Sequence, residues 1–224
     1  MDTGTETGTE NGALRDLADD PSSRKRFLKM VGGGGAAAFA TFLAACGSDD
    51  DEESGSTQSK STGGGRDLEI VQYALTLEHL ETDFYDAVIK SGAVKDRKLA
   101  DTAKSIRDNE QAHVDALTQT VEQLGGKPKR PRTTFDAVIE GGQKMILETA
   151  ATVENLGVAA YLGQAPRINS KEILASALAI HTVEARHAAA LNKVVGKTIV
   201  PDDAFAKPAS MKEVLPQVQP FLVK

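Results

Sequence analysis

Glu110-Gln111-Ala112-His113 is the most informative segment of the chain, because a second copy of its pattern occurs as Glu184-Ala185-Arg186-His187. An isolated glutamate precedes each copy, Glu78 by 32 residues and Glu154 by 30 residues. Four carboxylates and two imidazoles in two equivalent sets are typical of a protein site that binds two metal ions.

The three-residue spacing within each copy favours a site inside a helical bundle. Residues three apart on an α-helix lie on one face, about one turn apart, so the carboxylate and the imidazole point toward the same place. Apolar residues flank both copies at alternating gaps of three and four, which is the buried stripe of a bundle helix. The two stripes are Leu99, Ala103, Ile106, Glu110, His113, Leu117 and Leu124, and Ile173, Ala177, Ile180, Glu184, His187, Leu191 and Val194.

The isolated glutamates lie on similar stripes. These are Val71, Ala74, Glu78, Glu81, Tyr85 and Val88, and Leu147, Ala150, Glu154, Gly157 and Tyr161. No lysine or arginine lies on the stripes to pair with the acids. Buried ionised carboxylates are costly unless they are paired or metal-bound, so two divalent cations are expected. Carboxylate with imidazole suits iron and manganese, and zinc less exclusively, and no thiolate is available.

This ligand pattern resembles that of the ferritin-like di-iron carboxylate superfamily, over roughly residues 67–195. The resemblance implies an all-α fold, a ferritin-like four-helix bundle with a long crossover between its second and third helices and a short C-terminal helix. It also implies two Fe ions, alternatively Mn, as cofactors. The implied metal ligands are Glu78, Glu110, His113, Glu154, Glu184 and His187. Within the superfamily, the segments 201–205 and 211–215 are similar to those of a bacterial group that includes desiccation-related proteins.

The helices are expected at residues 67–91, 96–124, 135–163, 171–195 and 210–219. Glycines follow the first, second and fourth of these, and Ser170 is a candidate N-cap. The glycines and prolines of residues 125–134 predict the crossover. We therefore divide the chain into a disordered leader (1–22), an export signal with a lipobox (23–46), a flexible linker (47–65), the four-helix bundle (66–196) and a C-terminal extension (197–224).

The export signal is predicted from its resemblance to known signals. Residues 23–29 resemble a twin-arginine signal with lysine in place of the second arginine, so the general secretory route stays open. The apolar run that follows is too short and too glycine-rich for a good membrane-spanning helix. Residues 43–46 resemble a lipobox, which implies acylation of Cys46 and anchoring to the outer face of the cytoplasmic membrane. The alternative is an uncleaved anchor with a buried Cys46.

The charge of the chain excludes one class of function. The net charge of −6 argues against a general nucleic-acid binder. The one local basic cluster, Lys127, Lys129, Arg130 and Arg132, lies in the proline-containing crossover, where we expect a solvated connection and not a binding patch.

Three further residues are candidates for a catalytic role: Glu81, Tyr85 and Tyr161. Glu81 lies one turn past Glu78, where the second repeat has Gly157. Four roles are open for Glu81. It is a seventh ligand, a base beside the ligands, or a replacement for Glu78, and otherwise it is a partly solvated side chain without a role at the metals. The tyrosines lie about 10 Å along their helices from the isolated glutamates, where they either pack in the core or form a redox or hydrogen-bonding layer.

Two histidines outside the motif, His79 and His181, are expected to be ordinary polar residues. For His181 a hydrogen bond to a ligand is the alternative.

The expected function is that of an exported, lipid-anchored di-metal protein that oxidises Fe(II) with O₂ or peroxide, as a ferroxidase or in peroxide removal. A dimanganese catalase-like reaction is a close variant, whereas cage-type iron storage fits poorly with a tethered N-terminus. The alternative is a non-enzymatic, metal-binding stress or desiccation protein of the cell envelope. An enzyme needs an open coordination position, for which the small Gly157 and Ala150 leave room. The oligomeric state is open, with a homodimer as one option.

Overall fold

The computed structural model describes residues 63–223. The predicted leader, the export signal with Cys46, and most of the predicted linker lie outside the described residues. In the described part no helix is both long and apolar enough to cross a membrane.

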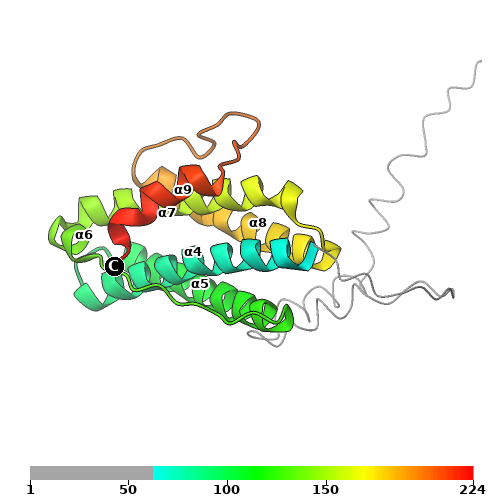
Figure 1. Cartoon of the computed structure of the whole chain (residues 1–224). Coiled ribbons are helices and arrows are strands. Elements are labelled where there is room, and N and C mark those ends of the chain that lie inside the picture. The colour runs from blue at the N-terminus through cyan, green and yellow to red at the C-terminus, as the bar shows by residue number, and fades with distance from the viewer. Residues whose placement is uncertain (1–62, 224) are drawn as a thin grey trace, which may run out of the picture. The chain divides into compact units, whose positions relative to one another are not determined.

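Four long helices form the bundle (Figure 1): α4 (Gly63–Ser91), α5 (Arg97–Gln123), α7 (Gly142–Gln164) and α8 (Lys171–Val194). Helix α4 lies against α5, and α7 lies against α8, so the two halves of the sequence repeat form two helical hairpins. Two short helices, α6 (Asp136–Glu140) and α9 (Met211–Val218), and two 3₁₀ turns complete the described chain, which contains no strand. The structure confirms the predicted all-α, ferritin-like four-helix bundle.

Most helix ends lie where the sequence predicts them. The side chain of Ser170 accepts a hydrogen bond from the amide of Ile173 and caps α8. Gly92, Gly125 and Gly196 follow the ends of α4, α5 and α8 with positive φ, a conformation that glycine adopts without strain. Helix α4 begins at Gly63, somewhat earlier than expected.

The prediction of one helix over residues 135–163 is wrong, because the chain breaks there into α6 and α7. Gly142 has a φ of +76°, which ends the regular helix path between them. Phe135, which precedes the short α6, is buried, and its ring packs against Phe84 and Phe221. Hydrophobic spacing alone does not reveal this break, since apolar positions continue on both sides of it.

The crossover between α5 and α6 runs along α4 (Figure 1). It starts with Gly126 packed closely on Leu68, near the beginning of α4. It ends with Arg130 and Thr133, which donate hydrogen bonds to the carboxylate of Asp83 over 2.5 and 2.8 Å. The four basic residues of this segment are exposed, as expected for a solvated connection.

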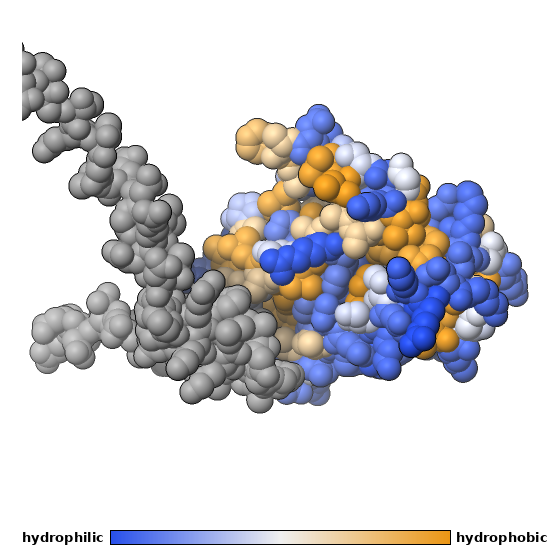
Figure 2. Space-filling view, turned by 180° about the vertical axis from the view of Figure 1, so that it is seen from behind, coloured by the Kyte–Doolittle hydropathy of each residue, from blue (hydrophilic) through white to orange (hydrophobic). Residues whose placement is uncertain are grey.

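The core consists of two apolar clusters with a polar layer between them. One cluster contains Phe84, Val88, Ile106, Ile146 and Leu191, and the other contains Val71, Leu75, Val114, Val121 and Ile180. The C-terminal helix α9 packs on the outside, as predicted, with Val214 and Val218 buried in the first cluster. Apolar side chains also remain at the surface (Figure 2), and Ile199, Val200 and Phe205 are more than half exposed.

Candidate metal centre

The polar layer contains all six predicted ligands, and each of the four long helices contributes to it. Glu78 comes from α4 and Glu154 from α7, whereas α5 and α8 contribute one glutamate and one histidine each. The structure brings together Glu78, Glu110, His113, Glu154, Glu184 and His187. The four glutamates are fully buried, and the two histidines are 9% and 7% exposed.

These residues form two overlapping sets. In the first, Nδ1 of His113 lies 3.1 Å from Oε2 of Glu78, 2.9 Å from Oε2 of Glu110 and 3.1 Å from Oε1 of Glu184. In the second, Nδ1 of His187 lies 2.9 Å from Oε1 of Glu110 and 3.3 Å from Oε2 of Glu154. Each set offers four ligand atoms within 4.8 Å of one another, and both sets include Glu110 and Glu184. Two adjacent cations could therefore share these two carboxylates.

The unpaired atoms of the cluster show that its residues fit a metal centre. Oε1 of Glu110, Oε2 of Glu154, both oxygens of Glu184 and Nδ1 of His187 are buried without an aligned hydrogen bond. Some of them lie close to one another, but close distances without hydrogen-bond geometry do not satisfy a buried polar atom. Cations placed among these atoms would satisfy them all.

Burial and the closeness of the charged groups also shift the pKa values of the metal-free cluster. Burial raises the pKa of Glu78 to about 7, although the nearby His113 opposes the shift. Burial and the charge of Glu78 hold the pKa of Glu184 well above its usual range. Burial disfavours the charged form of His187, but Glu110 and Glu154 outweigh it and raise the pKa to about 9. The metal-free cluster therefore retains protons that cations would displace.

Glu110 is the exception among the carboxyls. Burial alone would raise its pKa, but the close approach of the His113 and His187 imidazoles outweighs this effect and lowers the pKa to about 2. One of the two shared carboxylates is thus already ionised at neutral pH.

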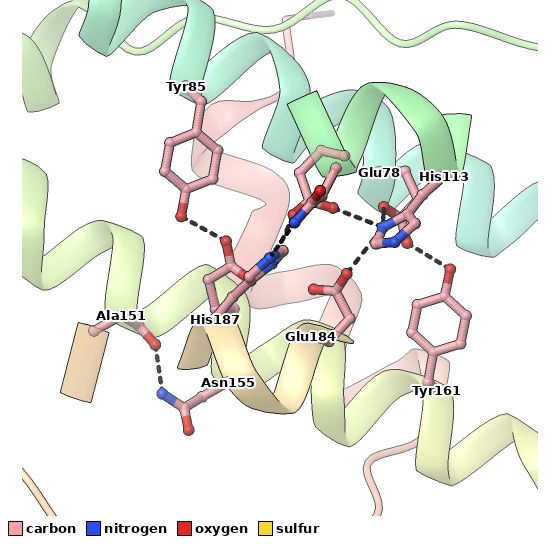
Figure 3. A network of polar contacts seen from close by, with 11 residues as sticks. Glu78, Tyr85, His113, Ala151, Asn155, Tyr161, Glu184 and His187 are labelled. Atoms are coloured by element: carbon pink, nitrogen blue, oxygen red, sulfur yellow. Dashed lines mark hydrogen bonds and ion pairs between the residues drawn. The ribbon is translucent and has the colours of Figure 1, made fainter. Parts of the chain in front are cut away.

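Two tyrosines lie on opposite sides of the cluster and point into it (Figure 3). The hydroxyl of Tyr85 donates to Oε1 of Glu154, and that of Tyr161 donates to Oε1 of Glu78, each over 2.5 Å. The rings of both tyrosines pack in the core clusters, and their hydroxyls form a hydrogen-bonding layer, so core packing and hydrogen bonding occur together. The sequence did not reveal that each tyrosine contacts the glutamate of the other repeat.

Glu81 also belongs to the polar layer. It is 3% exposed, which excludes the partly solvated alternative, and its carboxylate lies beside Gly157 of α7. Burial, followed by the charges of Glu184 and Glu154, holds its pKa well above the usual range.

The remaining histidines lie apart from the cluster. His79 is buried toward the crossover, and burial, followed by the charge of Arg130, lowers its pKa. His181 interacts with the backbone of Val158 and with none of the six residues of the cluster.

Sequence reasoning missed Asn109. Its amide nitrogen lies 3.1 Å from Nε2 of His187, on the side of the ring that faces away from the cluster. Asn109 precedes Glu110 directly, so adjacency to a ligand was the available signal, but its partner is on another helix. Asn155 and Asn192 exchange hydrogen bonds between α7 and α8 next to Glu154. Sequence reasoning missed them too, because the partner of each lies on another helix.

The sequence profile of the ferritin-like domain matches residues 66–197, which include the four long helices almost completely. No curated protein matches the chain. The match covers more than half of the chain, and the protein belongs to the family of ferritin-like domains.

Proposed function

We propose that this protein binds a dinuclear iron or manganese centre and uses it for oxidoreductase chemistry with O₂ or peroxide, as a ferroxidase or in peroxide removal. The observation that carries the proposal is the pair of overlapping ligand sets, in which four buried carboxylate oxygens and Nδ1 of His187 have no hydrogen-bond partner. Iron or manganese bound there would supply the change of oxidation state that the reaction needs.

The charges of the six residues support two divalent cations. Four carboxylates with two neutral imidazoles balance the charge of two such ions, and a buried centre is most favourable when its net charge is small. Oxygen and nitrogen donors without thiolate favour iron and manganese.

The tyrosines would orient the carboxylates. Each hydroxyl holds one oxygen of Glu78 or Glu154, so the second oxygen faces the histidine of the same set. Such fixed orientation keeps donor atoms in place when the charge of a bound ion changes.

An apolar cavity of about 120 Å³ adjoins Tyr85 and supports O₂ as the oxidant. Its walls come from all four long helices and include Phe84, Val88, Leu99, Ile146, Leu147 and Leu191. Dry apolar cavities accept small apolar molecules more readily than polar ones such as peroxide.

We further propose that the domain acts outside the cytoplasm, anchored to the membrane through Cys46. The supports are the signal-like segment and the lipobox-like segment of the sequence.

The test compares the full chain with a Glu110→Ala, Glu184→Ala double variant, since these two carboxylates belong to both sets. The wild type should retain about two Fe or Mn per chain and oxidise added Fe(II), and the double variant should do neither. Glu148→Ala is the matched control, because Glu148 is an exposed carboxylate paired with Lys144.

Circular dichroism would show that each variant is folded. Stoichiometric metal without turnover of Fe(II) or peroxide would favour the non-enzymatic stress protein. A wild-type protein that binds neither Fe nor Mn would overturn the proposal.

A further inference from the structure

The crossed tyrosine bonds define how the two repeats face each other. Tyr85 lies seven residues past Glu78 and reaches Glu154, and Tyr161 lies seven residues past Glu154 and reaches Glu78. Helices α4 and α7 therefore run in opposite directions past the cluster. Residues 81 and 157, about midway along these spans, are expected to meet between the two ligand sets.

In the structure, residues 81 and 157 do lie next to each other. A Cβ atom added to Gly157 would lie 3.1 Å from Oε1 of Glu81 and 3.2 Å from Oε2 of Glu184. The space that a side chain at position 157 would fill is thus taken by the carboxylate of Glu81. The repeat is symmetric in its six ligands but asymmetric at this pair, with a carboxylate on one side and glycine on the other.

Glu81 forms no ion pair in the described part of the chain. The charged groups that act most strongly on it are four other carboxylates, in the order Glu184, Glu154, Glu78 and Glu110. Oε2 of Glu184, which faces the same place next to Gly157, also lacks a hydrogen-bond partner. Two buried carboxylate oxygens that converge on one point without a donor between them are the arrangement that a cation stabilises.

We propose that Glu81 is a seventh protein ligand, which binds the dinuclear centre on its Gly157 side next to Glu184. This inference rests on the proposed function, because it requires a bound metal pair. It makes the two halves of the centre inequivalent. Five carboxylates carry one charge more than two divalent cations balance, so Glu81 favours a pair in which one ion has become trivalent.

Cobalt(II) provides a test that does not depend on activity. The full chain, freed of metal and titrated with Co(II), should show visible absorption bands whose intensity rises when the coordination number falls. Glu81→Gln and Glu81→Ala leave the six other ligands, so both variants should still bind two Co(II) ions. We expect the affinity for one ion to fall about ten-fold or more and the bands to strengthen.

Acetate adds a second readout. It should return the spectrum of Glu81→Ala toward that of the wild type by occupying the vacated position. Glu69→Gln is the control, because Glu69 is an exposed carboxylate on the same helix. Glu81→Gln keeps the volume of the side chain, so it tests the inference even where Glu81→Ala fails to fold.

The outcomes separate the two proposals. Two Co(II) ions bound with equal affinity and equal spectra in wild type and Glu81→Gln would overturn the role of Glu81 and leave the metal centre intact. A wild-type protein that binds no Co(II) pair would overturn both proposals.

Discussion

At the scale of single residues, Glu78 and Glu154 divide their oxygens in the same way. In each, Oε1 accepts a hydrogen bond from a tyrosine, and Oε2 lies 3.1 or 3.3 Å from a histidine. The tyrosine thus determines which oxygen remains available inside the cluster. The tyrosine hydroxyls should therefore contribute to the free energy of unfolding even when no metal is bound.

Tyr161→Phe removes the only hydrogen-bond donor to Oε1 of Glu78 among residues 63–223 and should lower the free energy of unfolding by about 1–3 kcal/mol in the metal-free protein. Tyr73→Phe is the matched control, because the Tyr73 hydroxyl is also buried but has no partner, and its loss should be neutral or stabilising. Urea unfolding in the presence of EDTA measures both. Equal losses of stability in the two variants would show that the Tyr161 bond adds nothing.

Asn109 is a positioning residue for His187. When Nδ1 of His187 binds a cation, the ring proton is on Nε2 and must be donated, so the amide of Asn109, whose nitrogen faces Nε2 in this structure, has to turn its oxygen toward the ring. Asn109→Leu should therefore weaken metal binding by about 10–100-fold, and Asn109→Asp, which keeps an acceptor, should weaken it much less. Titration with Mn(II) followed by electron paramagnetic resonance measures the affinity, with Lys104→Ala as an exposed control on the same helix. Equal affinities for the leucine and aspartate variants would contradict the role.

At the scale of the helices, the stripes and glycines of the sequence predicted the four long elements well, because each one contains its own signal. The contacts between elements could not be predicted in the same way. The crossed bonds of Tyr85 and Tyr161 depend on the opposite directions of α4 and α7, and the contact of Asn109 depends on α5 lying beside α8. The packing of Phe135 next to the break before α7 involves Phe84 and Phe221, which lie far away in the sequence.

The C-terminal extension reaches the bundle through a contact that only glycine allows. A Cβ atom at Gly163 of α7 would lie 2.0 Å from the carbonyl oxygen of Ala209, whose amide bonds to the carbonyl of Ala159. Gly163→Ala should displace this segment and destabilise the protein by about 1–3 kcal/mol. Hydrogen exchange should then be faster at the amides of Val214 and Val218, which α9 buries.

Gly64→Ala provides the comparison for Gly163→Ala. Gly64 lies in α4 with open space around its Cα, so alanine there should stabilise the helix by roughly 0.5–1 kcal/mol. Unchanged hydrogen exchange in α9 of Gly163→Ala would mean that the extension does not depend on this contact.

At the scale of the whole molecule, the buried cluster couples the stability of the metal-free protein to pH. The pKa of Glu78 is raised from 4.5 to about 7 and that of His187 from 6.5 to about 9, so the folded state binds these protons more tightly than the unfolded state. Their stabilising effect is complete below the unfolded values and disappears as the pH rises through the folded values. The pKa of Glu110 is lowered to about 2, so it matters only below pH 4.5 and lies outside this range.

The metal-free protein should therefore become less stable between about pH 5 and pH 9, by roughly 3 kcal/mol for each of the two groups. For a chain of this size the melting temperature should fall by about 10 °C or more. Bound Mn(II) displaces the same protons, so its stabilising effect should grow over the same range. Thermal unfolding at several pH values, with EDTA or with Mn(II), measures both trends. A melting temperature of the metal-free protein that stays constant or rises with pH would mean that these buried groups do not retain their protons. The net charge of the empty cluster would then have to be balanced in another way.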